Sequence, residues 1–243
     1  DAGAVPDPDR IHAERLRLEA AIARRLEPAL ERVYAAMATP GAFSPDAASA
    51  GRRALRLACL ALLSRIDGGE RAAVLFETAG NMTESAGALA SLIAAGRAEG
   101  ALAAFHDRWK GNRLVIDKWF ALQPALCAPE AAAGVAERLS RHPDFDWKNP
   151  NRFRALLGGL SANHAGFHAA SGASYRFCAD WLLRLDPVNP QTAARMSTAF
   201  QSWARYDDGR KARVRAELDR ILATPGLSRD LTEMAGRIRG ADA

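Results

Sequence analysis

Two stretches that begin alike decide the expected fold of this chain: NPNRFR at residues 149–154 and NPQTAAR at residues 189–195. Asparagine is a preferred helix N-cap, and proline fits the first helical turn because its missing N–H has no intrahelical partner there. Behind each start, apolar residues recur with the i, i+3, i+4, i+7 spacing of a half-buried helix: Phe153, Leu156, Leu157 and Leu160 in the first stretch, and Met196, Ala199, Phe200 and Trp203 in the second. We therefore expect two amphipathic helices, each with an arginine soon after its start, Arg154 and Arg195.

The helical period continues through the rest of the chain, with breaks at turns that contain proline or glycine. We expect Asp46, Thr83, Asp207 and Ser228 to cap four of these helices. The run Leu114–Phe120 is the most apolar in the chain and could form a strand, but the surrounding helical period favours a buried helix. Outside the two opening stretches, the expected helices cover about residues 11–37, 46–67, 70–79, 83–95, 98–109, 114–123, 129–139, 207–222 and 228–240.

The fold class follows from what this pattern contains and lacks. The sequence shows no strand-like alternation, no Asn-Gly hairpin signal and no βαβ rhythm. Many short helices joined by short loops indicate an all-α fold, a superhelical array of antiparallel helical hairpins of the HEAT-like or α-solenoid type, without a sheet and without strict repeats. We expect residues 1–10 to be a disordered or linker segment and residues 11–243 to form a single helical domain.

Composition narrows the class of protein. The chain has 243 residues and a net charge of +5, and 33 of its residues are Lys or Arg, nearly all of them Arg. These arginines alternate with Glu and Asp along most helices, which favours solvated helix faces over a nucleic-acid patch. No apolar run approaches the roughly 20 residues that a membrane span needs. Cys59, Cys127 and Cys178 are far apart among apolar neighbours, so we expect buried free thiols and a cytoplasmic location.

Motifs that would carry catalysis are missing from the sequence. His164 and His168 have the i, i+4 spacing of a metal pair, but Ala165 stands where a zincin has its general base. No Gly-x-Ser-x-Gly elbow and no Gly-x-x-x-x-Gly-Lys-Ser/Thr phosphate loop is present. We therefore expect no catalytic, metal or cofactor site in this chain.

Arg154 and Arg195 allow two interpretations. Each could bond or salt-bridge a neighbouring helix, which is the commoner role of an arginine on a helix. Each could instead face a cavity, where the guanidinium fork binds a carboxylate through two hydrogen bonds. Their spacing in the sequence does not choose between these roles.

Several segments, in register along the chain, resemble the C-terminal helical domain of bacterial aminopeptidase N, a family M1 zinc aminopeptidase. The resemblance runs from about Ile11 to Ile238. Two loops, 158–164 and 171–174, depart from the usual pattern of the family, which leaves the fold safe but changes the loops beside His168. The matching segments are Asn81–Glu84, Val115–Gln123, Asn149–Leu156, Ala165–Ala169, Tyr175–Phe177, Asn189–Arg195 and Arg205–Asp207.

This resemblance implies a non-catalytic domain that closes over the catalytic domain of the same enzyme and shapes the substrate cavity. The parent hydrolase would use zinc, held elsewhere by His-Glu-x-x-His, to release N-terminal amino acids from peptides in peptide catabolism. The chain alone would be inactive because it lacks that motif and the Gly-x-Met-Glu-Asn motif. Residues that match Arg154 and Arg195 would line the cavity and meet the peptide. The expected partners are that catalytic domain and a peptide, with no nucleic acid and no membrane.

Two other hypotheses stay open at this point. The chain could be a stand-alone helical-repeat scaffold that binds another protein. It could also be an RNA-binding helical array that uses the net positive charge, which would make its binding fall steeply with salt.

Overall fold

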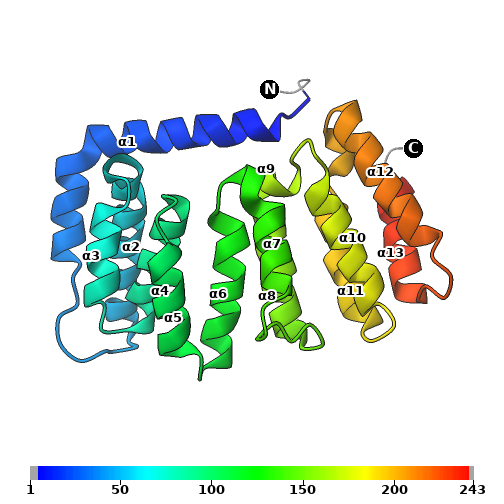
Figure 1. Cartoon of the computed structure of the whole chain (residues 1–243). Coiled ribbons are helices and arrows are strands. Elements are labelled where there is room, and N and C mark those ends of the chain that lie inside the picture. The colour runs from blue at the N-terminus through cyan, green and yellow to red at the C-terminus, as the bar shows by residue number, and fades with distance from the viewer. Residues whose placement is uncertain (1–4, 241–243) are drawn as a thin grey trace. The chain divides into compact units, whose positions relative to one another are not determined.

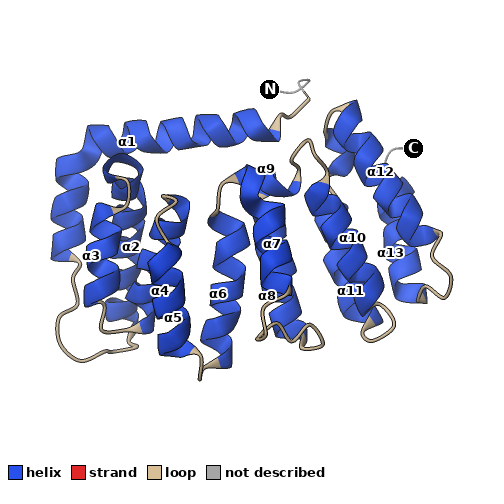
Figure 2. Ribbon diagram, in the orientation of Figure 1, coloured by secondary structure: helices blue, strands red, loops and turns tan. Residues whose placement is uncertain are grey.

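A computed structural model of the chain describes residues 5–240, and this range consists of helices and the loops between them, with no strand (Figure 2). The expected all-α class is confirmed. The described residues group into two compact units: an N-terminal unit, His12–Leu122, and a C-terminal unit, which combines the chain up to Ile11 with the chain from Gln123 onward. The expectation of a single domain over residues 11–243 stays a prediction.

The N-terminal unit is a stack of antiparallel helices in which α2, α3 and α4 pack against one another (Figure 1). Trp119 ties the last two helices of the unit together, because its indole N–H donates to the carbonyl of Leu102 at 3.0 Å. The run from Leu114 to Phe120 is helical, as expected. The helices are α1 (Pro8–Ala36) from His12 onward, α2 (Ala47–Asp67), α3 (Glu70–Thr78), α4 (Met82–Ala94), α5 (Glu99–Trp109) and the first part of α6 (Arg113–Leu126).

The C-terminal unit pairs α7 with α8, α10 with α11 and α12 with α13, and α11 also packs along α13. Its α-helices are α7 (Ala132–Ser140), α8 (Pro150–Ala162), α9 (His164–Phe167), α10 (Ala173–Leu185), α11 (Pro190–Ser197), α12 (Asp208–Leu222) and α13 (Arg229–Arg239). Short 3-10 helices η1 (Pro129–Ala131), η2 (Thr198–Phe200) and η3 (Trp203–Arg205) connect them.

The N-terminus of the chain differs from the expectation of a linker over residues 1–10. Residues 1–4 lie outside the described range, but Pro8–Arg10 form the first turn of α1. The reason is a cap: the Asp7 carboxylate accepts hydrogen bonds from the N–H groups of Asp9 and Arg10 at 3.0 and 3.1 Å. Further along, α1 is continuous through Pro28, and Figure 1 shows the helix bent in its second half.

Most helix starts follow the residue types that the sequence offers. Asp46, Asp207 and Ser228 each accept a backbone N–H of the first turn at 2.9–3.2 Å, as expected. Thr83 is the exception. The cap of α4 is Asn81, whose amide oxygen accepts from the N–H of Glu84 at 3.0 Å while its amide nitrogen donates to the Glu84 carboxylate.

The two Asn-Pro helices start as expected but differ in length. Asn149 and Asn189 cap α8 and α11, with proline at the first helical position of each. The continuous helix expected through Trp203 is wrong, because α11 ends at Ser197. The hydroxyls of Ser197 and Thr198 donate to the carbonyls three residues back, at 2.7 Å each, and so compete with the helical pattern.

Buried aromatic rings fill the core of the C-terminal unit. Phe167, Tyr175, Phe200 and Trp203 are almost fully buried, and Phe167 packs edge-on against Tyr175 with ring centres 5.5 Å apart. The Trp203 indole N–H donates to the carbonyl of Ile238 at 2.8 Å. This bond fixes the last turn of α13 to the core.

One polar side chain joins the start of α9 to the end of α6 in this core. Asn163, buried between α8 and α9, donates through its amide nitrogen to the carbonyls of Pro124 and Cys127, at 3.0 Å each. Its amide oxygen accepts the N–H of Gly166 at 3.1 Å. Gly166 lies so close to α7 that an added Cβ would be 2.6 Å from the Cβ of Ala132.

This close approach generates a prediction about two glycines of the C-terminal unit. Gly166→Ala should lower the free energy of unfolding by about 1–3 kcal/mol, because the Ala132 Cβ cannot move without its backbone. The matched control is Gly158→Ala in α8, where nothing lies within 4 Å of an added Cβ. It should raise the free energy of unfolding by up to about 1 kcal/mol, since alanine is the better helix former. Denaturant unfolding of both variants checks the pair, and equal effects would contradict the packing argument.

Candidate functional site

Arg154 lies in α8 and is exposed. Its guanidinium folds back on the first turn of its own helix. Nε donates to the carbonyl of Pro150 at 3.0 Å, and Nη2 donates to the amide oxygen of Asn151 at 2.8 Å. These are weak, exposed contacts that a ligand could replace at small cost. In this structure Arg154 has the local, helix-bonding role.

Arg195 is placed differently. It is exposed on α11 and forms no ion pair or hydrogen bond through its side chain within residues 5–240. It lines a groove of about 390 Å³ between α11 and α13, together with Arg237, Asp230 and Glu233. A free guanidinium fork in a groove can receive a carboxylate, which is the second interpretation that the sequence left open.

Arg154 and Arg195 do not line the same groove. Arg154 is absent from its lining, although α8 and α11 are in contact within the same unit. Their role as substrate-binding residues stays a prediction, as do the expected absences of a catalytic residue, a metal ligand and a cofactor.

His164 and His168 do come together, with ring centres 4.7 Å apart, but within a hydrogen-bonded network. His168 Nδ1 lies 2.9 Å from the Tyr175 hydroxyl, and its Nε2 lies 3.3 Å from the Ser202 hydroxyl. His164 Nε2 bonds the Tyr206 hydroxyl at 2.8 Å. Both nitrogens of His168 and one of His164 are thus committed to hydroxyl partners.

The electrostatics of this network keep His168 neutral. Burial, together with the smaller effects of His164 and Arg210, lowers the pKa of His168 to about 3. Burial also lowers the pKa of His164 and raises that of Tyr175. Arg210 is held beside them, with Nε on the carbonyl of His168 at 2.6 Å and Nη1 on Asp207 at 2.6 Å. The histidines and Tyr175 thus form an uncharged, hydrogen-bonded cluster next to the fixed guanidinium of Arg210. This cluster stabilises the fold.

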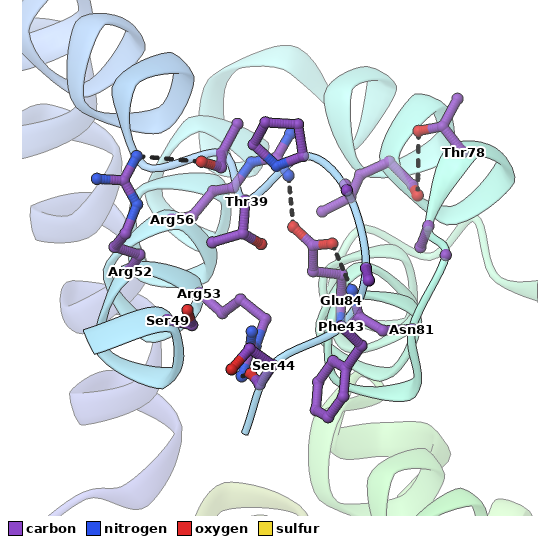
Figure 3. A pocket seen from close by; sticks show the side chains of 17 residues that line it. Thr39, Phe43, Ser44, Ser49, Arg52, Arg53, Arg56, Thr78, Asn81 and Glu84 are labelled. Carbon is purple, nitrogen blue, oxygen red and sulfur yellow. Dashed lines mark hydrogen bonds and ion pairs between the residues drawn. The ribbon is translucent and has the colours of Figure 1, made fainter. Parts of the chain in front are cut away.

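A second cavity was missed by sequence reasoning. It lies in the N-terminal unit, has a volume of about 630 Å³, and is bounded by the loop 38–44, the first turns of α2, the end of α3 and the start of α4 (Figure 3). We call it the arginine cavity, because Arg52, Arg53 and Arg56 of α2 line it, opposite Glu84 of α4. Its sequence signal was the cluster of three basic residues in the first turns of α2, facing a loop with Thr39-Pro40-Gly41.

Two further observations limit the chemistry. Cys59 and Cys178 are buried free thiols, as expected, whereas the free thiol of Cys127 is only half-buried. Burial raises the pKa of all three, so none is an activated thiolate. Among residues 5–240, no helix is both long and apolar enough to cross a membrane.

The DUF3458_C family, described as a domain of unknown function with ARM repeats, matches residues 1–240. This chain belongs to the DUF3458_C family. ARM repeats are stacked helices, so the family match supports the expected array of helical hairpins.

Three similar proteins are named aminopeptidase N. The protein from Caulobacter vibrioides is 43% identical over 240 residues, which cover 96% of this chain and 28% of that relative. The protein from Haemophilus influenzae is 35% identical over 93% of this chain and 26% of its own length, and that from Escherichia coli is 38% identical over 75% and 22%. The chain thus spans about a quarter of the length of these relatives.

A solved structure gives the same result at the level of the fold. The crystal structure of Legionella pneumophila aminopeptidase A in complex with aspartic acid matches with a TM-score of 0.85 and 31% identity. The match covers 96% of this chain and 29% of that protein. The resemblance expected from the sequence segments is confirmed: the chain corresponds to one helical part of a larger aminopeptidase.

The neutral state of His168 predicts a pH dependence of stability. Its pKa is lowered from an ordinary value near 6.5 to about 3 in the folded chain. The unfolded chain therefore takes up the proton first, and stability that is present above pH 6.5 is lost as the pH falls toward 3. Between pH 7 and pH 5 the wild type should lose about 2 kcal/mol more of its free energy of unfolding than His168→Gln. Urea unfolding at both pH values measures this difference, and parallel losses in the two proteins would contradict it.

Proposed function

We propose that this chain is the non-catalytic C-terminal domain of a zinc-dependent aminopeptidase N of family M1. It closes over the catalytic domain, shapes the substrate cavity and so restricts release of N-terminal amino acids to peptides that can enter. The observation that carries the proposal is the coverage: 43% identity over 96% of this chain, but only 28% of the relative. The remaining length of such a relative has room for the catalytic centre.

The residues of this chain fit a supporting role better than a zinc site. The sequence has no His-Glu-x-x-His, and His164 and His168 are committed to Tyr206, Tyr175 and Ser202. Zinc, which would activate the attacking water, is proposed to be held by the catalytic domain of the parent enzyme. The chain by itself is proposed to be inactive, and the parent enzyme to act in peptide catabolism in the cytoplasm.

For this function, Arg195 is a better candidate than Arg154 for binding the substrate. Its fork has no partner within residues 5–240 and lines a groove, whereas Arg154 must first leave Pro150 and Asn151. Both would meet the carboxylate of a short peptide whose amino end is at the catalytic centre. Such contacts contribute to ground-state binding and not to the chemical step.

A stand-alone scaffold that binds another protein is the second candidate, and one observation favours it. Leu18, Ile22 and Leu26 form an exposed apolar stripe on α1, with exposed fractions of 61%, 38% and 47%. Apolar stripes on helices usually contact something. In the aminopeptidase proposal, the remainder of the enzyme covers this stripe.

A two-piece experiment distinguishes the candidates. This chain is mixed with the separately produced remainder of the parent enzyme, loaded with zinc. We expect a complex by size-exclusion chromatography and a change in peptide hydrolysis. Ile22→Asp should weaken the complex, whereas Arg24→Asp, an exposed substitution two residues along α1, should leave it intact. If the pieces neither associate nor change hydrolysis, the aminopeptidase proposal loses its mechanism.

The arginines give a kinetic prediction for the complete enzyme. Arg195→Ala or Arg154→Ala should raise KM for short peptides by about three- to tenfold, with a smaller rise for the same peptides as C-terminal amides. The reason is that the amides carry no carboxylate for the fork to bind. Arg176→Ala, an exposed arginine of α10, is the control and should change neither KM. Equal rises for peptides and amides would assign the arginines a structural role.

A further inference from the structure

The arginine cavity of the N-terminal unit carries a surplus of positive charge. Three guanidinium groups line it, from Arg52, Arg53 and Arg56, and one carboxylate, that of Glu84, faces them. The nearby Asp46 does not line the cavity, and its carboxylate is committed to the Ser44 hydroxyl and the N–H of Ser49. Like charges four residues apart on a helix repel one another, so this cluster is costly unless an anion is near.

The innermost arginine is fixed in place. Arg53 is only 4% exposed, its Nη2 donates to the carbonyl of Ser44 at 2.9 Å, and its guanidinium lies 4.6 Å from the centre of the Phe43 ring. Its Nε is buried and has no hydrogen-bond partner in the described chain. A carbonyl and a ring do not neutralise a guanidinium, so Arg53 supplies an uncompensated charge to the cavity wall.

The other two arginines present open donors. Arg52 and Arg56 are four residues apart, so they project from the same face of α2, one turn from each other. Among the described residues, Arg52 bonds only through Nη2, to the carbonyls of Ala36 and Ala38. Arg56 pairs through Nη1 with Glu84 and stacks over the Tyr34 ring at 4.7 Å, which leaves its Nη2 without a partner in residues 5–240.

Figure 3 shows Arg52, Arg53 and Arg56 on one side of the space and Glu84 with Asn81 on the other. The Glu84 carboxylate is fully used, because Arg56 and the Asn81 amide both donate to it. A ligand would therefore meet guanidinium donors and no free carboxylate. The volume of about 630 Å³ is that of an ordinary small-molecule site.

We propose that the arginine cavity binds a small molecule through an oxyanion, a carboxylate or a phosphate, held by Arg52 and Arg56 against the fixed charge of Arg53. Planar guanidinium forks match both oxyanions through paired hydrogen bonds. This site is independent of the aminopeptidase proposal, since it uses only contacts within the N-terminal unit.

The test uses the whole 243-residue chain and two compounds, inorganic phosphate and the dipeptide Ala-Ala. The control compound is Ala-Ala amide, which has no C-terminal carboxylate. Isothermal titration at constant ionic strength, set with chloride, measures binding. We expect saturable binding of phosphate, of Ala-Ala, or of both, and none of the amide. Phosphate alone identifies a phosphate site, and Ala-Ala alone identifies a carboxylate site.

Two variants localise the binding. Arg52→Ala should weaken it by about tenfold or more, the loss expected for a charge-assisted hydrogen bond. Arg97→Ala is the matched control, because Arg97 also donates to a loop carbonyl, that of Gly68 at 3.2 Å, but does not line the cavity. The double variant Arg56→Gln with Glu84→Gln removes the ion pair without stranding a buried carboxylate, and it should also weaken binding. No saturable binding of either compound, or equal binding by Arg52→Ala and Arg97→Ala, would overturn the proposal.

Discussion

The C-terminal unit depends on one amide side chain, that of Asn163. It ends α8 and begins α9, and its two polar atoms bond three backbone groups: two carbonyls at the end of α6 or just after it, and one N–H in α9. A four-residue helix such as α9 has no stability of its own in water. Because Asn163 and the contact between Gly166 and Ala132 hold it, α9 delivers Phe167 and His168 to the aromatic core. An aliphatic residue at 163 would leave the carbonyls of Pro124 and Cys127 and the N–H of Gly166 without these bonds in a buried site.

Much of the fold could be predicted because capping and periodicity are local properties. Asp46, Asn149, Asn189, Asp207 and Ser228 act where their residue types suggest. The prediction that Thr83 caps α4 was wrong because a better cap, Asn81, lies two residues earlier and also bonds the side chain of Glu84. The break at Ser197 was missed because the hydroxyl bonds that cause it compete with an otherwise sound apolar pattern.

The sites were less predictable, because they depend on contacts between residues far apart in the sequence. Spacing could not show that Arg154 bonds its own helix while the Arg195 fork has no partner in the described part of the chain. Composition favoured solvated helix faces over a nucleic-acid patch, but it did not show what the arginines do. Arg97 and Arg108 donate to loop carbonyls at the ends of α2 and α3. Such bonds satisfy backbone groups that helix ends leave open, a task for which the five donors of arginine are well suited.

The bond from Trp203 to the carbonyl of Ile238 spans 35 residues, and it has a consequence for the order of events during synthesis. A growing chain can form its early helical hairpins as each leaves the ribosome, since their contacts are local. The indole of Trp203 has no acceptor until α13 has emerged almost completely. Until then the packing of α13 against α11 and α12 is also missing from the C-terminal unit. Formation of the last turn of α13 is thus the last step in the folding of the C-terminal unit. A ribosome that stalls before Ile238 leaves that unit incompletely folded.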